Sequence, residues 1–254
     1  MIGGRADIAD AQLDSPLGRT SPVVKLAVAL VWLVGLALTL HPLPPVILAG
    51  AALIAGLTLG AIPPLELGRT LAPVWLAAVA IGLSNTLFSA ANGDPTTTTL
   101  AVIGPVRIAS EAVVNGVSLG LRVAAIACVG AVFALTTDPT RLADSLVQQA
   151  HVPARFAYGA LAAYQSIPRF GEDLATLRQA RRIRGRRGSW HPRILVGLLV
   201  LAIRHADRMA VSMDARAFGT RPRTHFRMLR WSWQDGAVAA AAVVTVVIAL
   251  VLGR

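Results

Sequence analysis

The sequence predicts an all-α polytopic membrane protein with about five transmembrane helices and a long cytoplasmic region of amphipathic helices. Hydrophobic residues make up 55% of the 254 residues and the mean hydropathy is +0.62, which is more than a soluble domain of this size needs for its core. Apolar runs of bilayer length recur along the chain. The whole net charge of +11 falls in residues 138–230, which hold 17 arginines against six acidic residues.

Five apolar runs approach the length of about 20 residues that a helix needs to cross a bilayer. Prolines mark the turns between them, because proline disfavours helical geometry in the residue before it. A proline-rich turn at residues 41–45 joins the first pair of spans, and Pro63 and Pro64 end the second span. Residues 92–110 form an exposed loop with room for a short hairpin. The expected spans are residues 23–40, 46–62, 71–90, 112–135 and 236–252.

The spans divide the chain into three parts. Residues 1–137 are the N-terminal membrane part with four spans, residues 138–233 are the basic region, and residues 234–254 hold the final span. Positively charged loops stay on the cytoplasmic side of a membrane. We therefore expect the N-terminus and the basic region inside the cell and the C-terminus outside. Acidic residues precede the first span where a signal peptide would be basic, so this span is expected to be retained.

The chain offers little for redox or metal chemistry. Its single cysteine, Cys128, excludes an intramolecular disulfide. Its five histidines show no metal-ligand spacing and have no cysteine cluster nearby, so no metal site is expected.

Arg122 lies near the middle of the fourth expected span, where a charge is costly and usually faces protein or water. Two interpretations stay open: intramembrane packing against another subunit, or a partner within the chain such as Asn85 or Glu111. The spans also hold two glycine pairs at the spacing that lets helices approach closely. In a chain with 22 glycines these pairs are only weak packing hints: Gly56 with Gly60, and Gly116 with Gly120.

The basic region is expected to form two long amphipathic helices. From Ala154 the apolar residues recur at three- and four-residue steps, the period of a helix with one buried side. Pro168 should kink this helix, and Gly185 is a typical helix stop. A second helix follows from about Ile194 to Gly219, and its apolar run is too short to cross a membrane.

Both helices end in a basic, glycine-terminated turn. A small residue beside an arginine leaves the guanidinium free to enter a groove and to bind carboxylates or carbonyls. The residues alone leave three targets open: a protein groove, anionic lipid headgroups and nucleic acid. Lipid binding needs no repeated motif, and no reader motif or aromatic series favours nucleic acid. The paired helix ends favour a protein partner.

These residues resemble the transmembrane T component of energy-coupling factor transporters, the vitamin and metal uptake systems that include the cobalt-transport Q-type proteins. The resemblance also covers residues 21–26, residues 136–139 and the Pro168 kink ahead of Glu172. In that family, each of two coupling helices ends in an X-Arg-X triplet that docks into a groove on one of two ATPase subunits. The matching triplets here are Ile183, Arg184, Gly185 and Ala215, Arg216, Ala217.

The resemblance implies a scaffold and coupling subunit that is not itself an enzyme. It would pass the ATP-driven motion of two ATPase subunits to a separate substrate-binding membrane S subunit for vitamin or metal-ion uptake. Rigid helices of about 30 residues, or about 45 Å, suit that task. The chain would lie in the cell membrane and bind no nucleic acid. It would need no cofactor of its own, because ATP and Mg would be bound by the partners.

Some features depart from the family or favour rivals. Ile183 is bulkier than the usual alanine, and Ala217 replaces the usual glycine. Asp214 and its neighbours superficially resemble part of the motif of CDP-alcohol transferases, which are membrane enzymes acting on phosphorylated lipid. The further aspartates of that motif are missing from residues 218–223. A second rival, the permease of a conventional ABC importer, would carry its own translocation path and usually one coupling segment.

Overall fold

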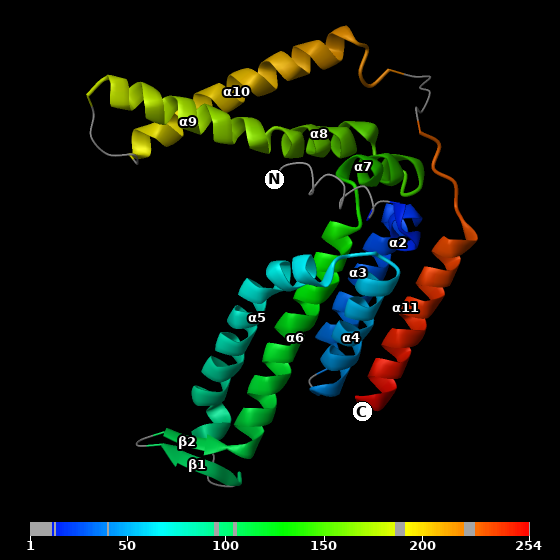
Figure 1. Ribbon diagram of the computed structural model, residues 1–254, viewed down its shortest axis with the longest axis vertical. Helices are drawn as coiled ribbons and strands as arrows, with labels where there is room; N and C mark the ends of the chain where they lie inside the picture. Colours follow the sequence, from blue (N-terminus) through cyan, green and yellow to red (C-terminus); the bar gives the residue numbers. More distant parts are fainter. Residues whose placement is uncertain are drawn as a thin grey trace. The chain divides into compact units, whose positions relative to one another are not determined.

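The computed structural model describes residues 12, 14–39, 41–93, 97–103, 106–185, 191–220 and 227–253. Helices dominate these residues, and one two-stranded hairpin interrupts them (Figure 1). The chain divides into two compact units. The first unit comprises Met1–Leu142 and Arg230–Arg254, and the second comprises Ala143–Leu229.

Five apolar helices make up most of the first unit, one for each expected span. Within the described residues, three of them are long and apolar enough to cross a membrane: α5 (Pro64–Leu87), α6 (Ser110–Leu135) and α11 (Trp233–Leu252). Two shorter apolar helices, α3 (Pro22–Ala37) and α4 (Leu43–Thr58), have 16 residues each. A four-residue helix, α2 (Pro16–Arg19), precedes them. The predicted fold class, an all-helical polytopic membrane protein, is confirmed.

The third apolar helix begins earlier than the sequence analysis placed it, at Pro64 instead of residue 71. A proline fits the first turn of a helix because its missing N–H would have no intrahelical partner there. Pro64 therefore starts α5, and α4 has already ended at Thr58. The prediction that Pro63 and Pro64 close the second span is wrong for this reason.

A short hairpin connects α5 to α6, as the loop composition predicted. Its strand β1 (Thr99–Ile103) pairs antiparallel with β2 (Val106–Ala109), after a short 3₁₀ helix, η1 (Ala90–Gly93). The side-chain oxygen of Asn92 accepts a hydrogen bond of 2.9 Å from the backbone N–H of Ala109. This bond holds the end of the hairpin beside the start of α6.

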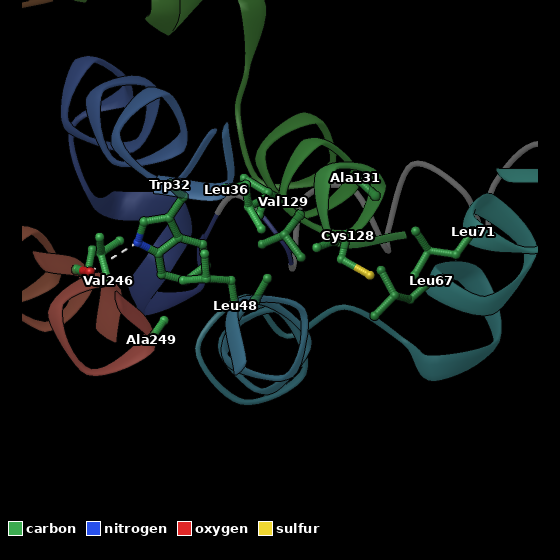
Figure 2. Packing of buried hydrophobic residues seen from close by; sticks show 14 of the residues in the cluster. Trp32, Leu36, Leu48, Leu67, Leu71, Cys128, Val129, Ala131, Val246 and Ala249 are labelled. Atoms are coloured by element: carbon green, nitrogen blue, oxygen red, sulfur yellow. Dashed lines mark hydrogen bonds between the residues drawn. The ribbon is translucent and has the colours of Figure 1, made fainter. Parts of the chain in front are cut away.

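The core of the first unit lies among α3, α4, α5, α6 and α11 (Figure 2). Trp32 of α3 is buried, and its indole N–H donates a 3.1 Å hydrogen bond to the backbone oxygen of Ala242 in α11. Leu36 and Leu48 are each 1% exposed, and Cys128 is fully buried. Because lipid is as apolar as these side chains, close packing and such hydrogen bonds hold membrane helices together.

Small residues set the contact between α5 and α6. A Cβ atom at Gly116 would lie 2.6 Å from the carbonyl oxygen of Gly82, and one at Gly120 would lie 3.0 Å from that of Ala78. The two backbones therefore touch where only glycine fits. The glycine pair that the sequence offered as a weak hint is a close helix contact. Gly56 is similarly crowded by the side chain of Val132 in α6 and by that of Ile62.

Buried polar groups tie α3, α6 and α11 together. Lys25 is buried, and its ammonium donates a 2.6 Å hydrogen bond to the backbone oxygen of Thr136. The carboxylate of Asp235 accepts hydrogen bonds from the backbone N–H groups of Ser21 at 2.6 Å and Ser232 at 2.8 Å. Buried charges need such partners. Asp235 thus closes the capping box of α11 and joins this helix to the start of α3.

Within its described residues, 138–185, 191–220 and 227–233, the basic region contains four helices, whereas two were expected from the sequence. They are α7 (Pro139–Gln148), at the boundary of the units, α8 (Ala154–Gln165), α9 (Ile167–Ile183) and α10 (Pro192–Ala215). Pro168 lies in the first turn of α9, so the expected kink is a break at Ser166, just ahead of the proline. The predicted length of about 30 residues is corrected to 17 for α9 and 24 for α10.

Candidate functional site

The C-terminal turn of α9 presents Arg184. Its backbone N–H donates to the oxygen of Ala180 at 3.3 Å, and the N–H of the next residue, Gly185, donates to the oxygen of Arg182 at 3.0 Å. Gly185 has a φ of +70°, a conformation that costs glycine nothing. The helix therefore stops at Arg184. Ile183 is 87% exposed and Arg184 is also exposed, so the turn is accessible from outside the chain.

The C-terminal turn of α10 presents Arg216. The N–H of Phe218 donates to the oxygen of Met213 at 3.0 Å, and the N–H of Ala217 donates to the oxygen of Asp214 at 2.9 Å. These two bonds make a Schellman motif, which ends a helix with a left-handed residue. Ala217 is that residue, with a φ of +55°. Arg216 and both of its neighbours are exposed.

Arg184 and Arg216 therefore occupy the same structural position. Each follows the last residue of a helix and precedes a residue with positive φ. The repetition seen in the sequence is thus a repeated backbone geometry. The docking role of the two triplets, residues 183–185 and 215–217, stays a prediction.

The two turns lie at opposite ends of a crossed helix pair. α9 and α10 run in opposite directions (Figure 1), and a Cβ atom at Gly197 would lie 3.4 Å from the side chain of Leu177. At 1.5 Å per residue, Arg184 lies about 10 Å beyond this contact along α9, and Arg216 about 28 Å beyond it along α10. Since the helices run in opposite directions, the arrangement offers two separate contact sites.

The turn of α10 is held against α8. The rings of Phe218 and Tyr158 pack edge to face with centroids 6.4 Å apart, and the Tyr158 hydroxyl donates to Asp144 at 2.8 Å. A Cβ atom at Gly219 would lie 2.9 Å from Nε of Arg155. These contacts were not predicted from the sequence. The available signal was an aromatic residue at position 158, off the predicted apolar stripe of that helix.

The second unit exposes a broad apolar surface. On α8 and α9 the predicted stripe is exposed at Phe156, Tyr164 and Ile167. On α10 the predicted stripe is exposed at Leu195 and half-buried at its other members. Apolar residues beside the stripe are also exposed: Val196, Leu199, Val200 and Ile203. Large exposed apolar surfaces mark contacts with protein or membrane.

Arg122 lies at the middle of α6, as the sequence indicated. Its Nε atom is buried and has no hydrogen-bond partner among the described residues. Within that part of the chain, no hydrogen bond or ion pair joins Arg122 to Asn85 or Glu111. Both interpretations of Arg122, packing against another subunit and a partner within the chain, stay predictions. An arginine at the centre of a membrane helix costs about 2.5–3.5 kcal/mol.

Comparisons with known proteins identify relatives over most of the chain. The family model CbiQ, described as a cobalt transport protein, matches residues 14–226. The energy-coupling factor transporter transmembrane protein EcfT of Heliobacterium modesticaldum is 29% identical over 246 residues, which cover 90% of this chain and 90% of that protein. The protein of the same name from Bacillus selenitireducens is 26% identical over 246 residues, which cover 89% of each.

A third relative has a different name and size. It is a putative ABC transporter ATP-binding protein of Bifidobacterium longum, 29% identical over 199 residues. The similarity covers 71% of this chain but only 25% of that protein.

Proposed function

The chain belongs to the CbiQ family of cobalt transport proteins and is a transmembrane coupling component of energy-coupling factor transporters, and from this premise we propose that Arg184 and Arg216 each dock into an ATPase subunit. Membership confirms the prediction that the chain is not an enzyme, since this family is a non-catalytic transporter component. It also decides against both rivals, the lipid-modifying enzyme and the conventional permease.

The repeated helix end is the observation that carries the proposal. Arg184 and Arg216 are the C-cap residues of α9 and α10, both are exposed, and their turns lie on opposite sides of the helix crossing. A planar guanidinium on an open turn is suited to bidentate binding in a groove. Two equivalent turns on separate sites fit two equivalent partners better than one.

The relative from Bifidobacterium longum supports an ATPase as the partner. A segment similar to this chain forms 25% of a protein that is named for ATP binding. A coupling segment and an ATP-binding protein that share one polypeptide work at a fixed high effective concentration. The chain described here would reach the same assembly by non-covalent docking.

The proposed mechanism assigns ATP hydrolysis to the partners. ATP and Mg would be bound by the two ATPase subunits, so this chain needs no cofactor. Its only lysine, Lys25, is buried against Thr136 and lies outside any Gly-Lys-Ser/Thr motif. When the ATPases close on ATP, they move α9 and α10 through the two arginine turns. The helices pass that motion to a separate substrate-binding membrane S subunit, which selects a vitamin or a metal ion.

The exposed apolar surface of the second unit is the proposed contact for that membrane subunit. Phe156 on α8 and Val196 and Leu199 on α10 belong to it. A cytoplasmic helix with one basic turn and one apolar face can bind an ATPase at its end and a membrane protein along its side.

The proposed orientation follows from where ATP is available. The ATPases are cytoplasmic, so the basic region and the N-terminus lie inside the cell and the C-terminus outside, in agreement with the positive-inside rule. Trp231 and Trp233 are 65% and 80% exposed at the start of α11, as tryptophans at a membrane interface commonly are.

The experiment is co-purification of the complete transporter in mild detergent from cells that express the ATPase genes. The double variant Arg184→Glu, Arg216→Glu should lower ATPase recovery at least about tenfold, as expected when a buried charge contact is reversed. A matched control, Arg169→Glu with Arg204→Glu, reverses one exposed arginine on the body of each helix. Equal recovery from both double variants would reject the docking assignment.

A further inference from the structure

Arg122 lies near the middle of the membrane helix α6, far from either end. It lies about 18 Å from the start of α6 and about 20 Å from its end, at 1.5 Å per residue. Half the hydrocarbon thickness of a bilayer is about 15 Å. Val117 and Ile126, just before and after it, are exposed apolar residues. The level of Arg122 is therefore the hydrocarbon core.

The first unit supplies no counter-charge to Arg122 within its described residues. Its carboxylates in the membrane helices lie in first turns: Glu66 of α5, Glu111 of α6 and Asp235 of α11. Glu66 accepts a hydrogen bond from Gln12, and Asp235 is bound by backbone N–H groups. Glu111 lies about 16 Å from Arg122 along the helix. The Nε atom of Arg122 is buried without a hydrogen-bond partner.

Arg122 belongs to a polar face of α6 that points away from α5. Glu111, Asn115, Ser118 and Arg122 follow at steps of four, three and four residues, which places them on one side of the helix. Gly120, which contacts α5, lies about 160° around the helix from Arg122. Glu111 and Asn115 are exposed, whereas Ser118 is buried and has an interaction within the chain. Polar residues within a membrane helix almost always face protein or a water-filled cavity.

We propose that this polar face of α6 binds a transmembrane helix of the neighbouring membrane subunit, and that this helix presents a carboxylate to Arg122. The inference rests on the proposed function, in which a separate membrane subunit works with this chain. Charge complementarity indicates which group the partner helix presents, because a guanidinium in hydrocarbon needs both a counter-charge and several acceptor oxygens. A carboxylate supplies both in a bidentate pair.

Photo-crosslinking in native membranes tests the position of the partner helix. A photo-crosslinking amino acid is placed at Asn115, about 20° around α6 from Arg122, or at Val117, about 140° away. Both positions are exposed, so they form a matched pair. We expect the Asn115 probe to capture a membrane helix of the neighbouring subunit that carries Asp or Glu near the bilayer centre. The proposal is overturned if the Val117 probe captures that helix as well as the Asn115 probe does. It is also overturned if the Asn115 probe captures a helix without an acidic residue, or only lipid.

Substitution of Arg122 tests the charge pair itself. In the full complex, Arg122→Leu should lower recovery of the membrane subunit at least about tenfold relative to the ATPases, whereas Arg122→Lys keeps most of it. Exchange of the two charges, Arg122→Asp with the captured acid changed to arginine, should restore recovery. Retained membrane subunit in Arg122→Leu, or no restoration by the exchange, overturns the proposal.

The two proposals fail in different ways. If the ATPases still co-purify with the Arg122→Leu variant, the variant chain is folded and assembled with them. If the ATPases stay bound and depend on Arg184 and Arg216, but the membrane subunit is indifferent to Arg122, only the charge pair is rejected. If the wild-type chain recovers no ATPases, the proposed function itself fails.

Discussion

The ring of Phe218 packs edge-on against the ring of Tyr158, with their planes inclined at 76°. Tyr158 belongs to α8, and its hydroxyl donates a hydrogen bond to Asp144 of α7. Phe218 lies two residues beyond Arg216, in the same turn. The position of the Arg216 turn is therefore set by side chains from two other helices of the second unit.

Removing the ring at position 158 should loosen the Arg216 turn. An edge-to-face aromatic pair contributes about 0.5–1.5 kcal/mol, so Tyr158→Leu should speed local opening about two- to tenfold. Hydrogen–deuterium exchange of residues 213–219 measures this opening. Tyr158→Phe keeps the ring and loses only the hydrogen bond to Asp144, so its effect should be smaller. Equal protection in the wild type and Tyr158→Leu would show that the ring does not hold the turn.

Glycine at position 217 should stabilise the same turn. Ala217 has a φ of +55°, and a left-handed conformation costs a residue with a Cβ atom about 1–2 kcal/mol. Ala217→Gly should therefore slow exchange of the Phe218 amide, which donates to Met213. Ala215→Gly, at the last helical residue, should act in the opposite direction because glycine disfavours helix by up to about 1 kcal/mol. If both variants slow exchange of the Phe218 amide, or both speed it, the result contradicts this account.

The positions of the membrane helices could be predicted because each apolar run is continuous in the sequence. The start of α5 could not, since Pro64 is compatible with either the end of one helix or the first turn of the next. The break at Ser166 was expected as a kink, because the sequence shows a proline but not whether the helix continues through it.

The basic helix ends could be found from repeated arginines and glycines, but the contacts that support them could not. Tyr158 meets Phe218 across 60 residues of chain, and no local pattern pairs them. The same holds for Arg122, because its sequence position does not show which side chains lie within its reach. Side-chain reach across helices depends on their rotation, which the sequence does not specify.

A methyl group at Gly116 should separate α5 from α6. The added Cβ atom would lie 2.6 Å from the carbonyl oxygen of Gly82, which is backbone and cannot move aside, and such overpacking costs about 1–3 kcal/mol. Gly116→Ala should therefore lower the midpoint of thermal unfolding in a fixed detergent. Gly130→Ala is the control on the same helix, because apart from its chain neighbours and the backbone of α6, no atom of the described residues lies within 4 Å of its added Cβ. If the unfolding midpoint of Gly116→Ala equals or exceeds that of the wild type, the close contact between Gly116 and Gly82 does not limit the stability of the protein.

The carboxylate of Asp235 should matter more for stability than the cap residue beside it. Asp235→Ala removes the hydrogen bonds from Ser21 and Ser232 and leaves the buried Ser21 N–H without this acceptor. An unsatisfied buried donor costs about 1–3 kcal/mol. Ser232→Ala loses the side-chain half of the capping box, which accepts from the backbone N–H groups of Gln234, at 3.4 Å, and of Asp235. An N-cap is worth about 1 kcal/mol. Thermal unfolding in one detergent compares the two variants. A midpoint that falls as far in Ser232→Ala as in Asp235→Ala would show that capping of α11 explains the whole effect, and that the link from Asp235 to Ser21 of α3 adds nothing.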